Sequence, residues 1–220
     1  MKALCTTLIV FCSALTSLKA QESSLAKANP VKFGVFAGLN YTNDVSAYSG
    51  IKSLSSFLAG VDIQYTLTNR TSLHLQPSWT QAESESNQAA LSISTFKLPL
   101  LYRYYISPNQ KQFFVQAGFG YNYLTNSNLR LRYDIYCIQA PCPNLGPDTP
   151  SSNKSAVSGM AGIGYTIELG KISVPITLQY ERNLSNYEFS PASWLDPSKT
   201  AGGPTRVQLE SFALTTGINF

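Results

Sequence analysis

The chain has 220 residues, of which 44% are hydrophobic, 12% aromatic and only 13% charged, and its formal net charge is +4. A soluble domain of this size carries about 25% charged residues, so part of the surface is not expected to meet water. No run of 18 apolar residues follows the N-terminal segment, which excludes transmembrane helices there, and the basic residues form no stripe that would favour nucleic acid.

Residues 1–20 have the order of a secretory signal peptide. Lys2 supplies a basic start, Leu8 to Phe11 form an apolar core, and Ala20 is a small residue at the expected cleavage site. An uncleaved membrane anchor is disfavoured because the apolar core is too short to span a bilayer. We therefore expect a cleaved signal peptide at 1–20, a short linker at 21–30 and one exported domain at 31–220. Without Lys2 and Lys19, 14 basic and 12 acidic residues leave a net charge of +2.

From Val31 onward apolar residues recur at every second position, which is the period of a β-strand. One face of each strand is apolar and aromatic, and the other is small, polar or charged. The alternation also continues beyond the fifth segment, at Leu129 and Leu131, and it shifts between Leu209 and Phe212, which predicts a bulge near Ser211. Eight segments show the pattern: 31–41, 57–65, 73–79, 96–104, 113–123, 161–169, 172–180 and 214–220.

The connections between these segments alternate in length. Short turns at 67–70, 107–110 and 170–171 join the second segment to the third, the fourth to the fifth and the sixth to the seventh. The other connections are long and rich in Ser, Asn, Pro and Asp, the longest at about 125–155. An up-and-down barrel places every second connection at the same end. The sequence therefore predicts an all-β fold, an eight-stranded antiparallel up-and-down β-barrel.

The polarity of the two faces indicates which one points inward. A soluble barrel of the lipocalin kind has its apolar face inside, whereas a membrane barrel turns that face to lipid. The low overall charge favours the second arrangement, as do aromatic residues at both ends of the segments. We therefore predict a transmembrane barrel of the outer-membrane type, with a soluble periplasmic lipocalin-like ligand carrier as the alternative. The predicted aromatic girdles are Phe33, Tyr65, Tyr104, Phe113 and Phe220 at one end, and Tyr41, Phe57, Trp79, Tyr123 and Tyr180 at the other.

Residues 96–105 and 113–120 carry a family resemblance. Pro99, Leu100, Leu101, Arg103 and the run 116–118 resemble the PorT-like outer-membrane β-barrel family of Bacteroidota, although Lys97 stands where that family often has an acidic residue. The resemblance implies an outer-membrane location and a barrel more than it implies a task.

The chain ends on an aromatic residue after alternating apolar ones, as outer-membrane barrels typically do. Phe220 is therefore expected to act as a C-terminal assembly signal. The expected partners are outer-membrane lipid, the barrel-assembly machinery acting through the last strand, and an unspecified ligand or protein at the long loops, with no nucleic acid among them.

The polar face of the predicted strands holds three basic and three acidic residues. An eight-stranded barrel is only wide enough for its side chains to fill, so these charges are expected to pair in a largely plugged lumen. A narrow gated conductance is the alternative. The predicted lumenal charge network consists of Lys32, Asp62, Lys97, Arg103, Glu168 and Glu181.

His74 is the sole histidine, and any nucleophile–base pair of the usual kind would need it. Its spacing implies neither an adjacent serine nor a third group. We therefore predict no catalytic, cofactor-binding or metal site, with a barrel-embedded outer-membrane enzyme as the competing hypothesis.

The longest connection contains the cysteines that remain after signal-peptide removal. Cys137 and Cys142 lie in a Pro-rich stretch of an exported protein, which favours a local disulfide over a metal site. The same region offers Arg130, Arg132 and Tyr133 as a candidate recognition patch, because loops on a rigid scaffold commonly carry binding.

Overall fold

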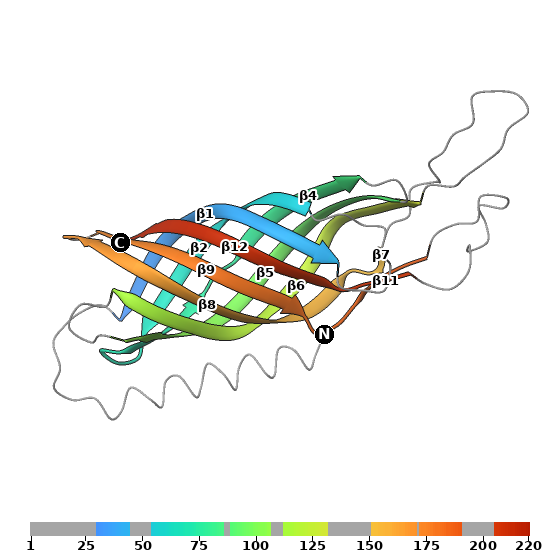
Figure 1. Ribbon diagram of the computed structural model, residues 1–220. Coiled ribbons are helices and arrows are strands. Elements are labelled where there is room, and N and C mark those ends of the chain that lie inside the picture. The colour runs from blue at the N-terminus through green and yellow to red at the C-terminus, as the bar shows by residue number, and fades with distance from the viewer. Residues whose placement is uncertain are drawn as a thin grey trace, which may run out of the picture.

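The structure is a computed structural model that describes residues 30–44, 54–85, 89–106, 112–131, 151–170, 172–190 and 205–220. They form a closed antiparallel β-barrel (Figure 1). The first wall strand, β1 (Val31–Asp44), pairs with both β2 (Leu54–Thr66) and the last strand, β12 (Leu209–Asn219), which closes the barrel. The other wall strands are β3 (Thr71–Leu75), β4 (Ser78–Glu85), β5 (Ala89–Tyr105), β6 (Phe113–Leu131), β8 (Ser155–Leu169) and β9 (Ile172–Asn183).

Eight strand positions make up the wall, because β3 and β4 share one position between β2 and β5. The interruption falls at Gln76 and Pro77, where proline removes a backbone donor. The carbonyl of Pro77 still accepts a hydrogen bond from Val61 N at 3.0 Å. The predicted fold class is confirmed. Among the described residues no helix has the length and apolar character needed to cross a membrane.

The apolar faces of the strands point outward. Leu39, Phe119 and Ile163 are 65%, 68% and 60% exposed, whereas the polar residues Asp62 and Arg103 are each 2% exposed. This polarity is the reverse of a lipocalin-like barrel and matches the lipid-facing arrangement of membrane barrels.

Strand register sorts the outward aromatic residues into two belts. Trp79 lies opposite Phe96, Phe96 opposite Tyr123, and Tyr41 opposite Phe212, so these side chains form the upper belt. Phe113 and Tyr165 pack edge to face in the lower belt, with ring centroids 4.7 Å apart. On β1, Phe33 and Tyr41 are eight positions apart. This is about 26 Å along the strand, or about 20 Å across a membrane once strand tilt is included.

The strands continue beyond the upper belt at the end of the barrel that carries the long connections, here named the long-connection end. The β5–β6 hairpin reaches farthest (Figure 1). β4 and β5 pair from Ser78–Lys97 to Glu85–Ala90, so the long loop expected between the third and fourth strands is wrong. Only residues 86–88 separate these strands, because the polar stretch forms a hairpin above the membrane band instead of a loop.

The predicted bulge near Ser211 is also wrong. Ser211 pairs in regular register with Thr42 and Glu181. The register instead shifts between Ser94 and Thr95, which leaves Thr125 of β6 as the extra residue; its Oγ1 donates to the Ser94 carbonyl at 3.0 Å. Beyond this bulge the inward face of β6 changes from even-numbered to odd-numbered residues.

A small sheet lies at the long-connection end of the barrel (Figure 1). It consists of β7 (Ser151–Asn153), β10 (Tyr187–Phe189) and β11 (Thr205–Val207), with β10 in the centre. Its buried side chains join inward-facing apolar side chains of the wall in one cluster, here named the mouth cluster: Leu54, Ala82, Leu91, Ile93, Leu124, Leu129, Ala156, Tyr187, Phe189, Val207 and Leu209.

Several sequence predictions fall outside the described residues. These are the signal peptide at 1–20, nearly all of the linker at 21–30, the two cysteines Cys137 and Cys142, and the loop residues Arg132 and Tyr133.

Candidate functional site

The half of the barrel interior nearer the short turns is filled by a hydrogen-bonded group here named the lower network. At its centre Asp62 of β2 accepts hydrogen bonds from His74 Nδ1 at 2.9 Å, Gln76 Nε2 at 3.2 Å and Asn219 Nδ2 at 3.4 Å. Ser72 Oγ lies 2.9 Å from the other ring nitrogen, His74 Nε2. Because Asn219 belongs to β12, the carboxylate links two strands that are separated by β1.

Arg103 of β5 forms the second part of the lower network. Its Nη2 and Nε donate to Gln116 Oε1 at 2.9 and 3.2 Å, and its guanidinium carbon lies 3.9 Å from the ring centroid of Phe114, a cation–π contact. Gln116 Nε2 continues the chain to Gln179 Oε1 at 2.9 Å. The Phe114 ring occupies the space where a Cβ of Gly164 would lie, so this glycine makes room for the ring.

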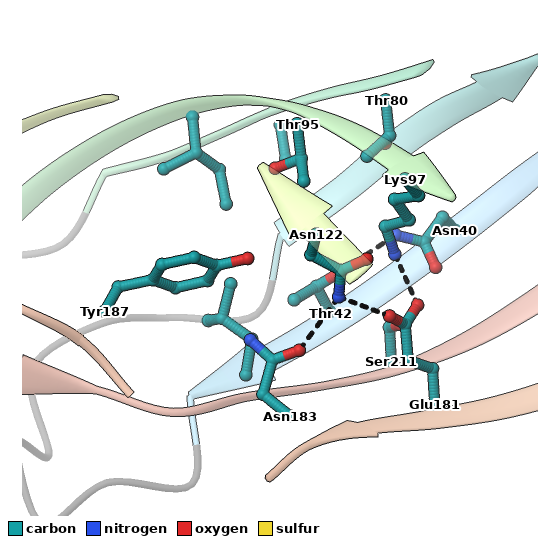
Figure 2. A pocket seen from close by; sticks show the side chains of 13 residues that line it. Asn40, Thr42, Thr80, Thr95, Lys97, Asn122, Glu181, Asn183, Tyr187 and Ser211 are labelled. Atoms are coloured by element: carbon teal, nitrogen blue, oxygen red, sulfur yellow. Dashed lines mark hydrogen bonds and ion pairs between the residues drawn. The ribbon is translucent and has the colours of Figure 1, made fainter. Parts of the chain in front are cut away.

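Above the lower network, an ion pair crosses the lumen and is here named the upper pair. Lys97 Nζ of β5 lies 2.5 Å from Glu181 Oε2 of β9 (Figure 2). Asn122 Nδ2 donates to Glu181 Oε1 at 2.6 Å and to Asn183 Oδ1 at 3.1 Å. The side chains of Lys97 and Glu181 are only 12% and 8% exposed, so water hydrates them little. Their mutual attraction and the hydrogen bonds to Glu181 compensate for this lost hydration.

The mouth cluster lies on the other side of the upper pair. Tyr187 of β10 points its ring from the small sheet toward Asn122 and Lys97 (Figure 2). Burial raises the pKa of the Tyr187 phenol, and the nearby Glu181 carboxylate acts in the same direction. Tyr187 and Phe189 are 2% and 1% exposed, so the lumen changes from polar to apolar at this level.

Two small cavities adjoin the upper pair. Each has a volume of about 20 Å³, which is room for about one water molecule. The one between the upper pair and Tyr187 is bordered by the side chains of Asn40 and Asn122, whose Oδ1 atoms are buried and make no hydrogen bond within the described residues.

The structure brings four of the six predicted lumenal charges inside the barrel, as two groups. Asp62 and Arg103 belong to the lower network, and Lys97 and Glu181 form the upper pair. Lys32 and Glu168 occupy strand ends, are exposed, and make no ion pair with any described residue. Phe220 is 64% exposed, with its backbone N bonded to the Phe33 carbonyl at 2.8 Å.

The partners of His74 were missed in the sequence. Ser72 lies two residues before it on the same strand face, a spacing that could have indicated a contact, and Asp62 comes from the neighbouring strand. The three side chains have the hydrogen-bond connectivity of a Ser-His-Asp triad. Ser72 and His74 are both 0% exposed, so no substrate reaches the hydroxyl in this conformation. Among the described residues no group of three or more His, Cys, Asp or Glu side chains could hold a metal ion.

Comparisons with known proteins agree with this architecture. A family model described as outer membrane protein beta-barrel domain matches residues 19–188. Among solved structures, Neisserial surface protein A is 9% identical with a TM-score of 0.51, and the match covers 88% of this chain and 98% of that one.

Two further solved structures are less similar. OprG from Pseudomonas aeruginosa is 14% identical with a TM-score of 0.49, covering 86% of this chain and 95% of that chain. Ail of Yersinia pestis is 12% identical with a TM-score of 0.45, covering 86% and 97%. No curated protein matches.

Proposed function

Because this chain belongs to the outer membrane protein beta-barrel domain family, we propose that it is a non-catalytic protein of the cell outer membrane whose lumen is largely plugged. Its work is done by surfaces at the long-connection end, in a structural or binding role. Export through a cleaved signal peptide and membership of the PorT-like branch are parts of the same proposal. The observation that carries it is the small size of the two cavities beside the upper pair, about 20 Å³ each.

The filling of the lumen supports this proposal at successive levels. Phe114 and Arg103 are buried toward the short turns, the upper pair crosses the middle, and Phe189 lies toward the mouth. A hydrated ion on this path would have to separate buried charges from their partners, which costs several kcal/mol. The lumen therefore acts as a rigid core rather than a pore.

Planar-bilayer recording of the refolded chain tests the plugged lumen. We expect no stable unitary currents from protein whose folded state is verified by heat-modifiable migration in detergent gels. Stable, large unitary currents from the same preparation would show that the lumen conducts and would reject the proposal.

The Ser72–His74–Asp62 arrangement favours a second candidate function, a barrel-embedded serine hydrolase. The three side chains form the hydrogen bonds that activate a serine nucleophile, but the Ser72 hydroxyl is fully buried. A fluorophosphonate probe distinguishes the two functions: we expect no labelling of the folded chain. Labelling that disappears in a Ser72→Ala variant would establish the hydrolase instead.

The remaining partners form part of the same proposal. Outer-membrane lipid covers the apolar outer face, and the barrel-assembly machinery acts through β12 and Phe220. A Phe220→Ser variant should give less heat-modifiable, folded protein in cells than a Phe33→Ser variant, which alters the neighbouring strand. Equal yields would remove the assembly role of Phe220.

The long loops complete the binding role, with a local disulfide between Cys137 and Cys142. Mass spectrometry after alkylation, with and without reduction, tests that bond. Alkylation of both Cys137 and Cys142 without reduction would exclude it.

A further inference from the structure

The upper filling of the barrel comes from a segment that is not part of the wall. β10 pairs with β7 and β11 only, as far as the described strands show. Tyr187 and Phe189 are nevertheless almost completely buried inside the mouth cluster. A local movement of β10 would therefore empty the mouth without breaking the backbone pairing of the barrel.

The floor beneath Tyr187 presents hydrogen-bond acceptors. The carboxylate of Glu181 can only accept, so the NH₂ group of Asn122 must face it, and this leaves Asn122 Oδ1 unpartnered at a residue 2% exposed. Asn40 Oδ1 is also unpartnered, at a residue 3% exposed. Both side chains border the same cavity as Tyr187 (Figure 2). A group that donates hydrogen bonds would complete this floor.

The charge of the floor further restricts the occupant. Lys97 and Glu181 neutralise each other, so an ionised ligand would lose its hydration without gaining a counter-charge. The walls around the cavity include the apolar side chains of Ala82, Ile93 and Leu209. Apolar walls beside a neutral floor whose unpartnered atoms are two amide oxygens fit a molecule with an apolar body and an uncharged donor at one end.

We propose that the mouth of the barrel is a binding site for a small neutral amphiphile, an aromatic or branched apolar body ending in a hydroxyl or amide donor. The Tyr187 ring occupies the apolar part of this site but leaves both amide oxygens unpartnered. The ligand displaces Tyr187 together with β10 and reaches those oxygens. The ligand enters from the long-connection end and stops at the upper pair, because the lower network stays filled. This site rests on the proposed function, which gives the long-connection end a binding role, and it specifies that the binding takes place in the mouth.

The test uses p-cresol, which is the tyrosine side chain without its backbone, and toluene, which lacks only the hydroxyl. Binding to the refolded full chain is followed through the side-chain amide signals of Asn40 and Asn122, at equal free probe concentrations set by dialysis. A Tyr187→Ala variant should bind p-cresol at least about tenfold more tightly than the wild type does, because the internal competitor is gone. The same variant should prefer p-cresol over toluene by at least about tenfold. Leu184→Ala, which alters an exposed side chain outside the cavity, is the matched control and should bind as the wild type does.

Equal binding of p-cresol and toluene would show that the site is only an apolar cavity and would overturn the inference. The absence of p-cresol binding to folded Tyr187→Ala at millimolar concentration would also overturn it. If the Tyr187→Ala variant does not fold, hydrogen exchange of backbone amides in the wild type tests the inference instead. p-Cresol, but not toluene, should accelerate exchange at residues 187–189, and equal rates would overturn the inference. The proposed function is tested separately: bilayer currents would reject it, and that measurement uses neither p-cresol nor toluene.

Discussion

The two halves of the barrel interior are filled by different chemistry from different parts of the chain. The lower network consists of polar side chains from the wall strands and from the interruption between β3 and β4, and they bond between neighbouring and next-but-one strands. The mouth cluster is apolar, and Tyr187, Phe189 and Val207 reach it from the small sheet. One barrel can therefore be filled by its own wall at one end and by a separate small sheet at the other.

Breaking the lower network should have the largest effect. Asp62→Ala removes the acceptor shared by His74, Gln76 and Asn219, and removes a negative charge that interacts with the buried Arg103 guanidinium. We expect a loss of about 3–5 kcal/mol in the free energy of unfolding, the range for breaking a buried charge network. Urea unfolding in detergent, followed by heat-modifiable gel migration, measures it.

Asp62→Asn is the matched control for that experiment. It keeps one acceptor oxygen of nearly the same shape, so its loss should be clearly smaller. Equal and small losses for both variants would mean that the lower network adds little to the stability of the wall.

Truncation in the mouth cluster should have a smaller effect on the unfolding of the barrel, because its cost is local to the small sheet. Phe189→Ala removes a ring that is 1% exposed, and comparable truncations in protein cores cost about 3–5 kcal/mol. That cost should appear in the opening of the small sheet, as faster proteolysis near residues 185–190. The unfolding of the barrel itself should hardly change. Barrel destabilisation as large as that of Asp62→Ala would show that the two halves unfold as one unit.

Raising the pH should have the smallest effect, again confined to the mouth. Burial raises the pKa of Tyr187, so the buried state keeps its proton where an exposed tyrosine loses it, above pH about 10. The stability that the buried, protonated phenol gives to the closed small sheet is fully present below that pH. This contribution falls as the pH rises and is smaller by about 1.4 kcal/mol at pH 11. Amide exchange at residues 187–189 should therefore accelerate between pH 10 and 11 beyond the intrinsic rate. Tyr187→Phe should lack this extra acceleration, and an identical profile for both proteins would contradict the assignment.

Alternation in the sequence was sufficient to predict the wall. Outward residues of these strands are mostly apolar and inward residues mostly polar, so the period-two pattern of β1, β2 or β9 identifies the two faces directly. The prediction failed where the lumen itself becomes apolar. Leu209 is buried at the mouth, so it is apolar although it faces inward, and its phase relative to Phe212 wrongly predicts a bulge near Ser211. The bulge in the structure is at Thr125 of β6, where the sequence predicts only that the strand continues to Leu129 and Leu131.

The interior site was predicted less completely, for two physical reasons. Alternation identifies the strand face on which Lys32 and Glu168 lie but not their position along the barrel axis. Both residues lie at strand ends, where water reaches them. Contacts between neighbouring strands depend on register, and contacts across the lumen depend on strand tilt as well; no local pattern encodes either. The pairing of Asp62 with His74, and of Lys97 with Glu181, therefore required the structure.

The bonds that cross the lumen also have a consequence for the order of folding. Asp62 receives Asn219 Nδ2 from a residue 157 positions later, and Lys97 meets Glu181 84 positions later. Before β9 has docked, Lys97 therefore lacks its counter-ion, and before β12 has docked, Asp62 lacks the donor on Asn219. Closing contacts so distant in sequence is slow. The hydrogen bonding of the interior is thus completed only as the last strands complete the wall, so closure of the barrel and stabilisation of its interior are coupled.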